Sequence, residues 1–214
     1  MRRLEQDVLR MGALVENSCR LSHQALFEHN LVAAEAIAPL DKQIDQFYRR
    51  IELDCIQLIT LQAPVAQDTR LLGAYMQLIR DLERIGDYAK NLADIAIKLF
   101  PHPPHPCMAQ IEVMSLQTQT MLATSLVALV DLDAEVGRRI KQMDCAVDAG
   151  YAAVYDILAQ TPLVCTNPSS APSSHQTLEP FILLALAIRH LERMADHATN
   201  IGQRVAFIVT GQRG

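Results

Sequence analysis

Apolar residues recur at intervals of three and four along most of the chain. Near the start, Leu4, Val8 and Met11 fall on one side of a helix drawn with 3.6 residues per turn, which is the pattern of an amphipathic helix. Apolar and polar residues do not alternate over any long run, as they would in half-buried strands. The chain is therefore predicted to be all-α.

Six long helices account for the pattern. Asn30 and Asp133 are candidate N-caps and Gly211 is a candidate stop signal, while Pro39 predicts a kink or short break in the second helix. Short turns between long helices favour antiparallel neighbours. We therefore expect two tandem antiparallel three-helix bundles, side by side or end to end. The helices are predicted at about 4–30, 32–61, 66–100, 108–132, 134–159 and 178–210.

A proline-rich stretch divides the chain. Residues 101–106 read PHPPHP, and four prolines in six residues cannot continue a helix. The predicted domains are a first bundle over residues 1–100, a Pro/His-rich linker over 101–106 and a second bundle over 107–214. A second Pro/Ser-rich loop is expected at residues 162–175, before the last helix.

One stretch of sequence is written twice. Residues 80–93 read RDLERIGDYAKNLA and residues 189–202 read RHLERMADHATNIG, with identical residues at seven of the fourteen positions. Chance would give roughly one match in a window of this size. The two copies lie 109 residues apart, late in each half, which indicates an internal duplication.

Composition narrows the functional classes. A net charge of −5 argues against a nucleic-acid-binding protein, which usually presents a basic face. No secretory signal is recognisable, and the longest apolar run, residues 181–188, is too short to span a membrane. The five cysteines are scattered and odd in number, as expected for reduced thiols. We expect a cytoplasmic protein.

The candidate chemistry lies in pairs of acidic residues that recur in both halves. Each half has an Asp-x-x-x-Asp on its second helix and a Glu-x-x-x-Asp on its third, and a spacing of four places both carboxylates on one helix face. If these faces pack together, four carboxylates converge in each half. The acids are Asp41, Asp45, Glu83 and Asp87 in the first half and Asp144, Asp148, Glu192 and Asp196 in the second.

Such a cluster requires protons, basic partners or metal ions. At ~4 Å and an effective dielectric constant near 20, each close pair of carboxylates would cost about 4 kcal/mol. Oxygen ligands suit Mg²⁺, Mn²⁺ or iron, and the recurrence of the arrangement favours metal. The alternative is a solvated acidic face neutralised by salt bridges to Arg80, Arg84, Arg189 and Arg193, while Asn91 and Asn200 are placed to complete a site or orient a carboxylate.

An enzyme is the less favoured interpretation. No glycine-rich loop follows a strand, no Glu-x-x-His pair of the ferritin-like type occurs, and no Ser/His/Asp or Cys/His arrangement stands out.

The repeated segments resemble the two signatures of the PhoU family, the phosphate-uptake regulators of bacteria. The resemblance rests on ERIGDYAKNLA and ERMADHATNIG and extends to LRMGALVENSCRLSHQAL, QAPVAQDTR and HATNIGQRVAF, so that it covers nearly the whole chain. It implies paired three-helix bundles with metal clusters on the eight acids, so the expected cofactors are iron, manganese, magnesium or zinc.

The function that the resemblance implies is regulatory. PhoU-like proteins repress the phosphate-starvation response, acting between the Pst phosphate transporter and a phosphate-sensing histidine kinase. The expected partners are the ATP-binding subunit of that transporter, the kinase and a second copy of the chain in a homodimer. Contact with the membrane is expected only through partners. The alternatives are a metal-free helical adaptor, a phosphate-transporter accessory protein of related form and, less favoured, a multinuclear metal enzyme.

Overall fold

The computed structural model describes residues 1–161 and 178–212, and these form six helices without a strand. The predicted all-α architecture is confirmed. The loop expected at residues 162–175 lies outside the described residues. The helices are α1 (Arg2–Phe27), α2 (Leu31–Gln62), α3 (Ala66–Leu99), α4 (Met108–Asp131), α5 (Ala134–Gln160) and α6 (Glu179–Thr210).

Local signals in the sequence set several helix ends. The Asn30 side chain accepts a hydrogen bond from the Ala33 amide at 3.1 Å, and the Asp133 carboxylate accepts from two amides at the start of α5. Gly211 ends α6 in the left-handed region, with φ of 72°. Pro39 does not break α2, which continues without interruption from Leu31 to Gln62.

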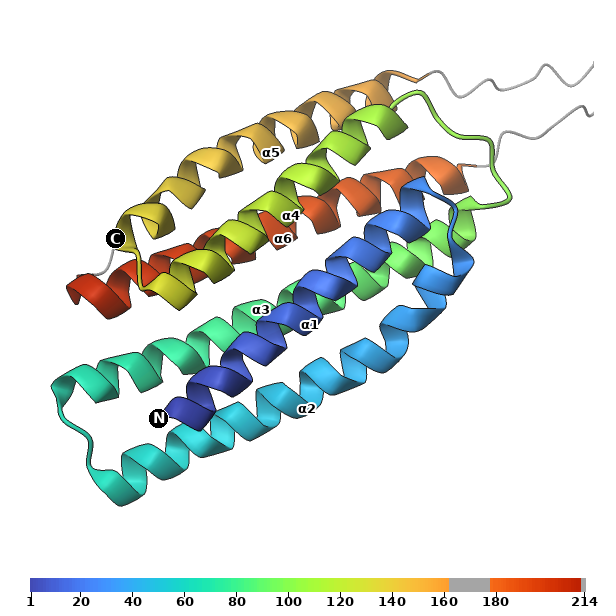
Figure 1. Ribbon diagram of the computed structural model, residues 1–214. Helices are drawn as coiled ribbons and strands as arrows, with labels where there is room; N and C mark the ends of the chain where they lie inside the picture. The colour runs from blue at the N-terminus through green and yellow to red at the C-terminus, as the bar shows by residue number, and fades with distance from the viewer. Residues whose placement is uncertain (162–177, 213–214) are drawn as a thin grey trace, which may run out of the picture.

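The two halves form bundles that lie side by side (Figure 1). Helices α1, α2 and α3 contact one another in the first bundle, and α4, α5 and α6 do so in the second. The bundles meet mainly through α3 against α6, with a smaller contact between α1 and α4. The two helices that carry the repeated motif therefore lie at the centre of the molecule.

Helix α4 is long and apolar enough, by length and composition alone, to cross a membrane, and it is the one helix among the described residues of which this is true. About 44% of its apolar window is buried within the protein, because α4 packs against α1, α5 and α6. The rest of the helix surface includes exposed apolar side chains such as Val127 and Val130.

Candidate metal centres

A close helix crossing places the acids of the first half together. Asp41 and Asp45 flank Ile44 on α2, and Glu83 and Asp87 flank Gly86 on α3. A β-carbon on Gly86 would lie only 3.1 Å from the Ile44 side chain, so the absence of a side chain at this position allows α2 to approach α3. The predicted faces therefore pack together in the first half, and their four acids form what we call the first cluster.

Basic side chains pair with individual acids of the first cluster. The Lys90 ammonium donates to the Asp41 carboxylate across the two helices, with an Nζ–Oδ2 distance of 2.6 Å. Arg84 lies 3.4 Å from Asp87 and 3.8 Å from Glu83. Asp41 is buried, whereas Glu83 and Asp87 are partly exposed. The acids of α3 thus face both the neighbouring helix and solvent.

The acids of the first cluster influence one another electrostatically. Burial raises the pKa of Glu83, and the nearby Asp87, Asp45 and Asp41 raise it further. The pKa of Asp87 is also raised, first by burial and then by Asp41. Because the charges of Asp41 and Asp45 on α2 act on both acids of α3, the four carboxylates share one patch of negative potential.

The second half repeats the arrangement. Val147 lies between Asp144 and Asp148 on α5, Ala195 lies between Glu192 and Asp196 on α6, and both Val147 and Ala195 are fully buried. The four acids form the second cluster. Arg189 contacts both carboxylate oxygens of Glu192, at 2.7 and 2.8 Å, and Arg193 donates to Asp196 at 3.1 Å.

The pKa of Asp144 is raised to about 6. Burial is the largest cause, followed by the charges of Asp148, Asp196 and Glu192, against which Lys141 acts weakly. The pKa of Glu192 is raised by burial, although Arg189 opposes the rise. The second cluster therefore also brings acids of two helices within electrostatic range.

As the side chains lie, no group of three or more His, Cys, Asp or Glu residues within residues 1–161 and 178–212 converges closely enough to hold a metal ion. Arginine or lysine side chains contact several of these carboxylates. The donor set nevertheless fits a hard cation, since it is made of carboxylate oxygens on two facing helices. The Lys90 ammonium already binds one of these oxygens as a cation would.

The remaining residues predicted at the sites divide into two groups. Arg84, Arg189 and Arg193 contact the predicted acids, as described above. Arg80 lies near the Tyr48 phenol, where its charge opposes the rise in the pKa of Tyr48. Asn91 is exposed, and the Asn200 amide donates to Asp81 at 3.3 Å.

A polar network between the bundles was not predicted. The His197 ring lies 2.8 Å from Asp81, across the α3–α6 contact, and stacks on Tyr88 at 5.9 Å between ring centroids. Tyr88 also hydrogen-bonds Arg193 and lies 5.4 Å from the His190 ring. Adding 109 to Asp81 and Tyr88 gives His190 and His197, so the network sits at corresponding repeat positions whose identities differ. A search for identical residues passes over such positions.

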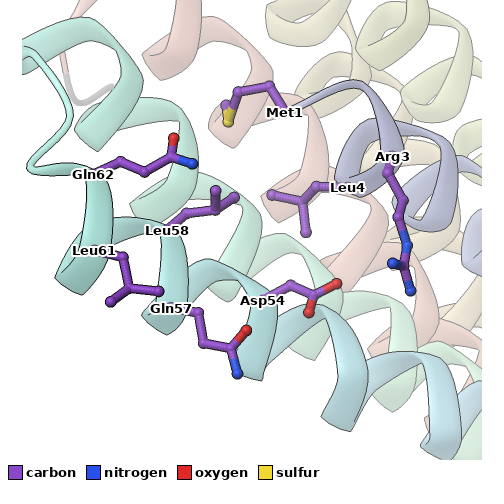
Figure 2. Close-up of a pocket in the computed structure, with 8 residues that line it drawn as sticks. All are labelled: Met1, Arg3, Leu4, Asp54, Gln57, Leu58, Leu61 and Gln62. Carbon is purple, nitrogen blue, oxygen red and sulfur yellow. The ribbon is translucent and has the colours of Figure 1, made fainter.

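The largest of the described pockets lies away from both clusters. It has a volume of about 330 Å³ and lies between the start of α1 and the end of α2. Figure 2 shows Leu4 and Leu58 near one another at this pocket, with Arg3 and Asp54 beside them. None of the eight predicted acids lines it.

Comparison with known proteins agrees with this architecture. A family model described as the PhoU domain matches residues 8–96 and 111–205, once in each half. A Synechocystis protein named phosphate-specific transport system accessory protein PhoU homolog is 56% identical over 213 residues, which cover all of this chain and 91% of that protein. A homolog of the same name from Pseudomonas putida is 30% identical and covers 97% of this chain and 78% of its own length.

Two solved structures share the fold. The crystal structure of PhoU from Pseudomonas aeruginosa superposes with a TM-score of 0.89 at 29% identity and covers 99% of this chain and 97% of that one. The phosphate transport system regulatory protein PhoU from Streptococcus pneumoniae gives a TM-score of 0.85 at 28% identity and covers 100% and 96% of the two chains.

Proposed function

Because this chain belongs to the PhoU family, we propose that it is a metal-binding cytoplasmic regulator of phosphate uptake and of the phosphate-starvation response. It acts negatively, between the Pst transporter and its sensor histidine kinase, and contacts the membrane only through these partners. The observation that carries the proposal is the 56% identity, over the whole chain, to a protein named as a phosphate-specific transport accessory protein.

The two clusters are the proposed metal sites. Asp41, Asp45, Glu83 and Asp87 would hold metal in the first bundle, and their counterparts on α5 and α6 would do so in the second. A bound divalent or trivalent cation supplies positive charge that joins carboxylates of two helices. The acids lie on both sides of the crossings of α2 with α3 and of α5 with α6, so metal would stabilise these helix pairs as a rigid surface for partners.

The most specific alternative is a metal-free helical adaptor. Arg84, Lys90, Arg189 and Arg193 already contact acids of the clusters, and these ion pairs would neutralise part of the negative charge without metal. Catalysis is not proposed, since the relatives are named as accessory proteins. The acidic chain is not proposed to bind nucleic acid, and a homodimer is the proposed assembly.

Deletion of the gene tests the regulatory role. We expect phosphate-starvation genes to be expressed in high phosphate after deletion, and wild-type protein to restore repression. A variant with both Glu83→Gln and Glu192→Gln should restore repression poorly while accumulating to the wild-type level. Continued repression and normal phosphate uptake in the deletion strain would contradict the proposal. Full restoration by the double variant would favour the metal-free adaptor.

A further inference from the structure

The two clusters differ at one pair of corresponding positions. Lys90 in the first copy of the repeat aligns with Thr199 in the second. Each follows the last acid of its Glu-x-x-x-Asp motif by three residues and so lies on the same side of its helix as that acid. One cluster therefore has an amino group where the other has a hydroxyl group.

The Lys90 ammonium lies among the acids of the first cluster. Its Nζ donates to Asp41 Oδ2 at 2.6 Å. This contact joins α3 to α2 and engages a carboxylate that is only 11% exposed. A metal ion that used Asp41 would have to displace this ammonium and break a charge-assisted hydrogen bond.

Thr199 is buried, with 7% of its surface exposed, and its hydroxyl has no hydrogen-bond partner among the described residues. Other helical threonines of this protein satisfy their hydroxyl locally. Thr118, Thr120 and Thr124 each donate to the carbonyl four residues earlier, at 2.7–2.9 Å. A buried hydroxyl that is left unpaired is costly, and it therefore indicates an oxygen available to a ligand.

The crossing of α5 and α6 places Thr199 at the level of the second cluster along the bundle. Gly202 of α6 meets Gly137 and Ile140 of α5, since a β-carbon on Gly202 would lie within 2.5 Å of one and 2.9 Å of the other. The two helices run antiparallel (Figure 1). One turn back along α6 from Gly202 is Thr199, and one turn forward along α5 from Ile140 is Asp144, so these residues lie at the same level of the bundle.

The arginines do not offset this difference. Arg84 contacts Asp87 and Arg193 contacts Asp196, each three residues away on its own helix, so this pair is the same in both halves. Arg189 pairs with Glu192 only in the second half, but its side chain is 50% exposed and belongs to the same helix. Such an exposed pair is screened by solvent and contributes little. Among the basic groups that contact the clusters, Lys90 is the one that crosses between helices to a buried acid.

We propose that the clusters are inequivalent: the second cluster binds a divalent cation more tightly, with the Thr199 hydroxyl as an additional oxygen ligand, while Lys90 competes for the first cluster. This inference rests on the metal binding proposed above and adds an order of filling. The carboxylates supply the charge at both sites, and the difference between Lys90 and Thr199 at corresponding repeat positions sets the difference in affinity.

Calorimetric titration of the full, metal-depleted chain with Mn²⁺ tests the proposal. Wild-type protein should show a tighter and a weaker class of sites. Glu192→Gln should remove the tighter class, and Glu83→Gln should remove the weaker one. Lys90→Thr should tighten the weaker class by about tenfold, the equivalent of one charge-assisted hydrogen bond. The control Lys98→Thr removes an exposed lysine from the same helix and should change neither class.

Thr199→Val isolates the hydroxyl while keeping the shape of the side chain. It should weaken the tighter class by about tenfold yet leave the thermal stability of the metal-depleted protein unchanged or raised, because it removes an unpaired buried oxygen. A purely structural role for Thr199 would not produce this opposite pair of effects.

The outcomes separate this inference from the function on which it rests. If both clusters bind Mn²⁺ with equal affinity and neither Lys90→Thr nor Thr199→Val changes it, the inequivalence is overturned while metal binding stands. A tighter class that Glu83→Gln removes would also overturn it. Absence of any Mn²⁺ binding to wild-type protein would overturn both the inference and the proposed metal sites.

Discussion

At the residue scale, Asp144 carries the largest electrostatic strain among the predicted acids. Its pKa is raised to about 6 by burial and by Asp148, Asp196 and Glu192, whereas an aspartate in an unfolded chain titrates near ~3.9. The folded protein therefore binds more protons than the unfolded chain between these two values. By linkage, the free energy of unfolding falls as the pH rises through this window.

Metal-depleted protein should accordingly lose thermal stability between about pH 4 and pH 6. Asp144→Asn should reduce this loss and raise the melting temperature more at pH 8 than at pH 4. The control Asp156→Asn changes an exposed acid on the same helix. Melting curves recorded by circular dichroism in the presence of a chelator provide the measurement. An equal effect of Asp144→Asn at both pH values would contradict the assignment.

The sequence predicts the acids but not the final position of their side chains. Helical spacing places each pair on one face, and the repeat indicates which faces correspond. Arg84 and Arg193 meet Asp87 and Asp196 at a spacing of three on their own helices, which a local pattern can suggest. The contact of Lys90 with Asp41 crosses between helices and depends on a distance that no local pattern contains. The unpaired hydroxyl of Thr199 is likewise visible only once the packing is known.

At the element scale, glycines set how closely the helices cross. Gly137 and Gly202 meet backbone to backbone, and a β-carbon on Gly202 would lie 2.5 Å from the Gly137 carbonyl oxygen. The first half has alanine at the corresponding positions, Ala34 and Ala93. The second half therefore has a backbone-to-backbone contact at positions where the first half carries methyl side chains.

Gly202→Ala should therefore destabilise the protein by about 1–3 kcal/mol, the usual cost of overpacking a core, because both helix backbones must move. Gly73→Ala is the matched control, since a β-carbon there meets nothing within 4 Å. That change should stabilise α3 by roughly 0.5–1 kcal/mol. Urea unfolding measures both variants, and a neutral Gly202→Ala would show that the helices do not cross so closely.

Helix number, most helix ends and the capping residues follow from the sequence because they depend on neighbouring residues along the chain. The short break that Pro39 could cause does not occur, since the helix continues through it. Tertiary packing of α2 against α1 and α3 outweighs the local disruption that a proline causes.

At the scale of the whole molecule, the contact between α3 and α6 joins the bundles. The sequence leaves open whether the bundles lie side by side or end to end, since the polar residues at this contact are not identical between repeats. Asp81 accepts from both His197 and Asn200 and is buried. The network thus links one bundle to the other next to the second cluster.

Asp81→Ala should lower the free energy of unfolding by about 1–3 kcal/mol, because the half-buried His197 and Asn200 of α6 lose their hydrogen-bond acceptor. A double-mutant cycle with His197→Ala should give a coupling energy of at least ~0.5 kcal/mol. Unfolding in urea supplies the values. Strict additivity of the two changes would mean that the contact does not join the bundles energetically.

The proposed function depends on carboxylates from two helices in each bundle holding metal. The metal-to-protein ratio of wild-type, Glu83→Ala and Glu192→Ala proteins, measured by elemental analysis after reconstitution and desalting, tests this directly. We expect metal at both clusters in wild-type protein, loss of one bundle's share in each single variant and loss of nearly all metal in the double variant. A wild-type protein without metal, or single variants that retain the full ratio, would mean that the clusters are not metal sites.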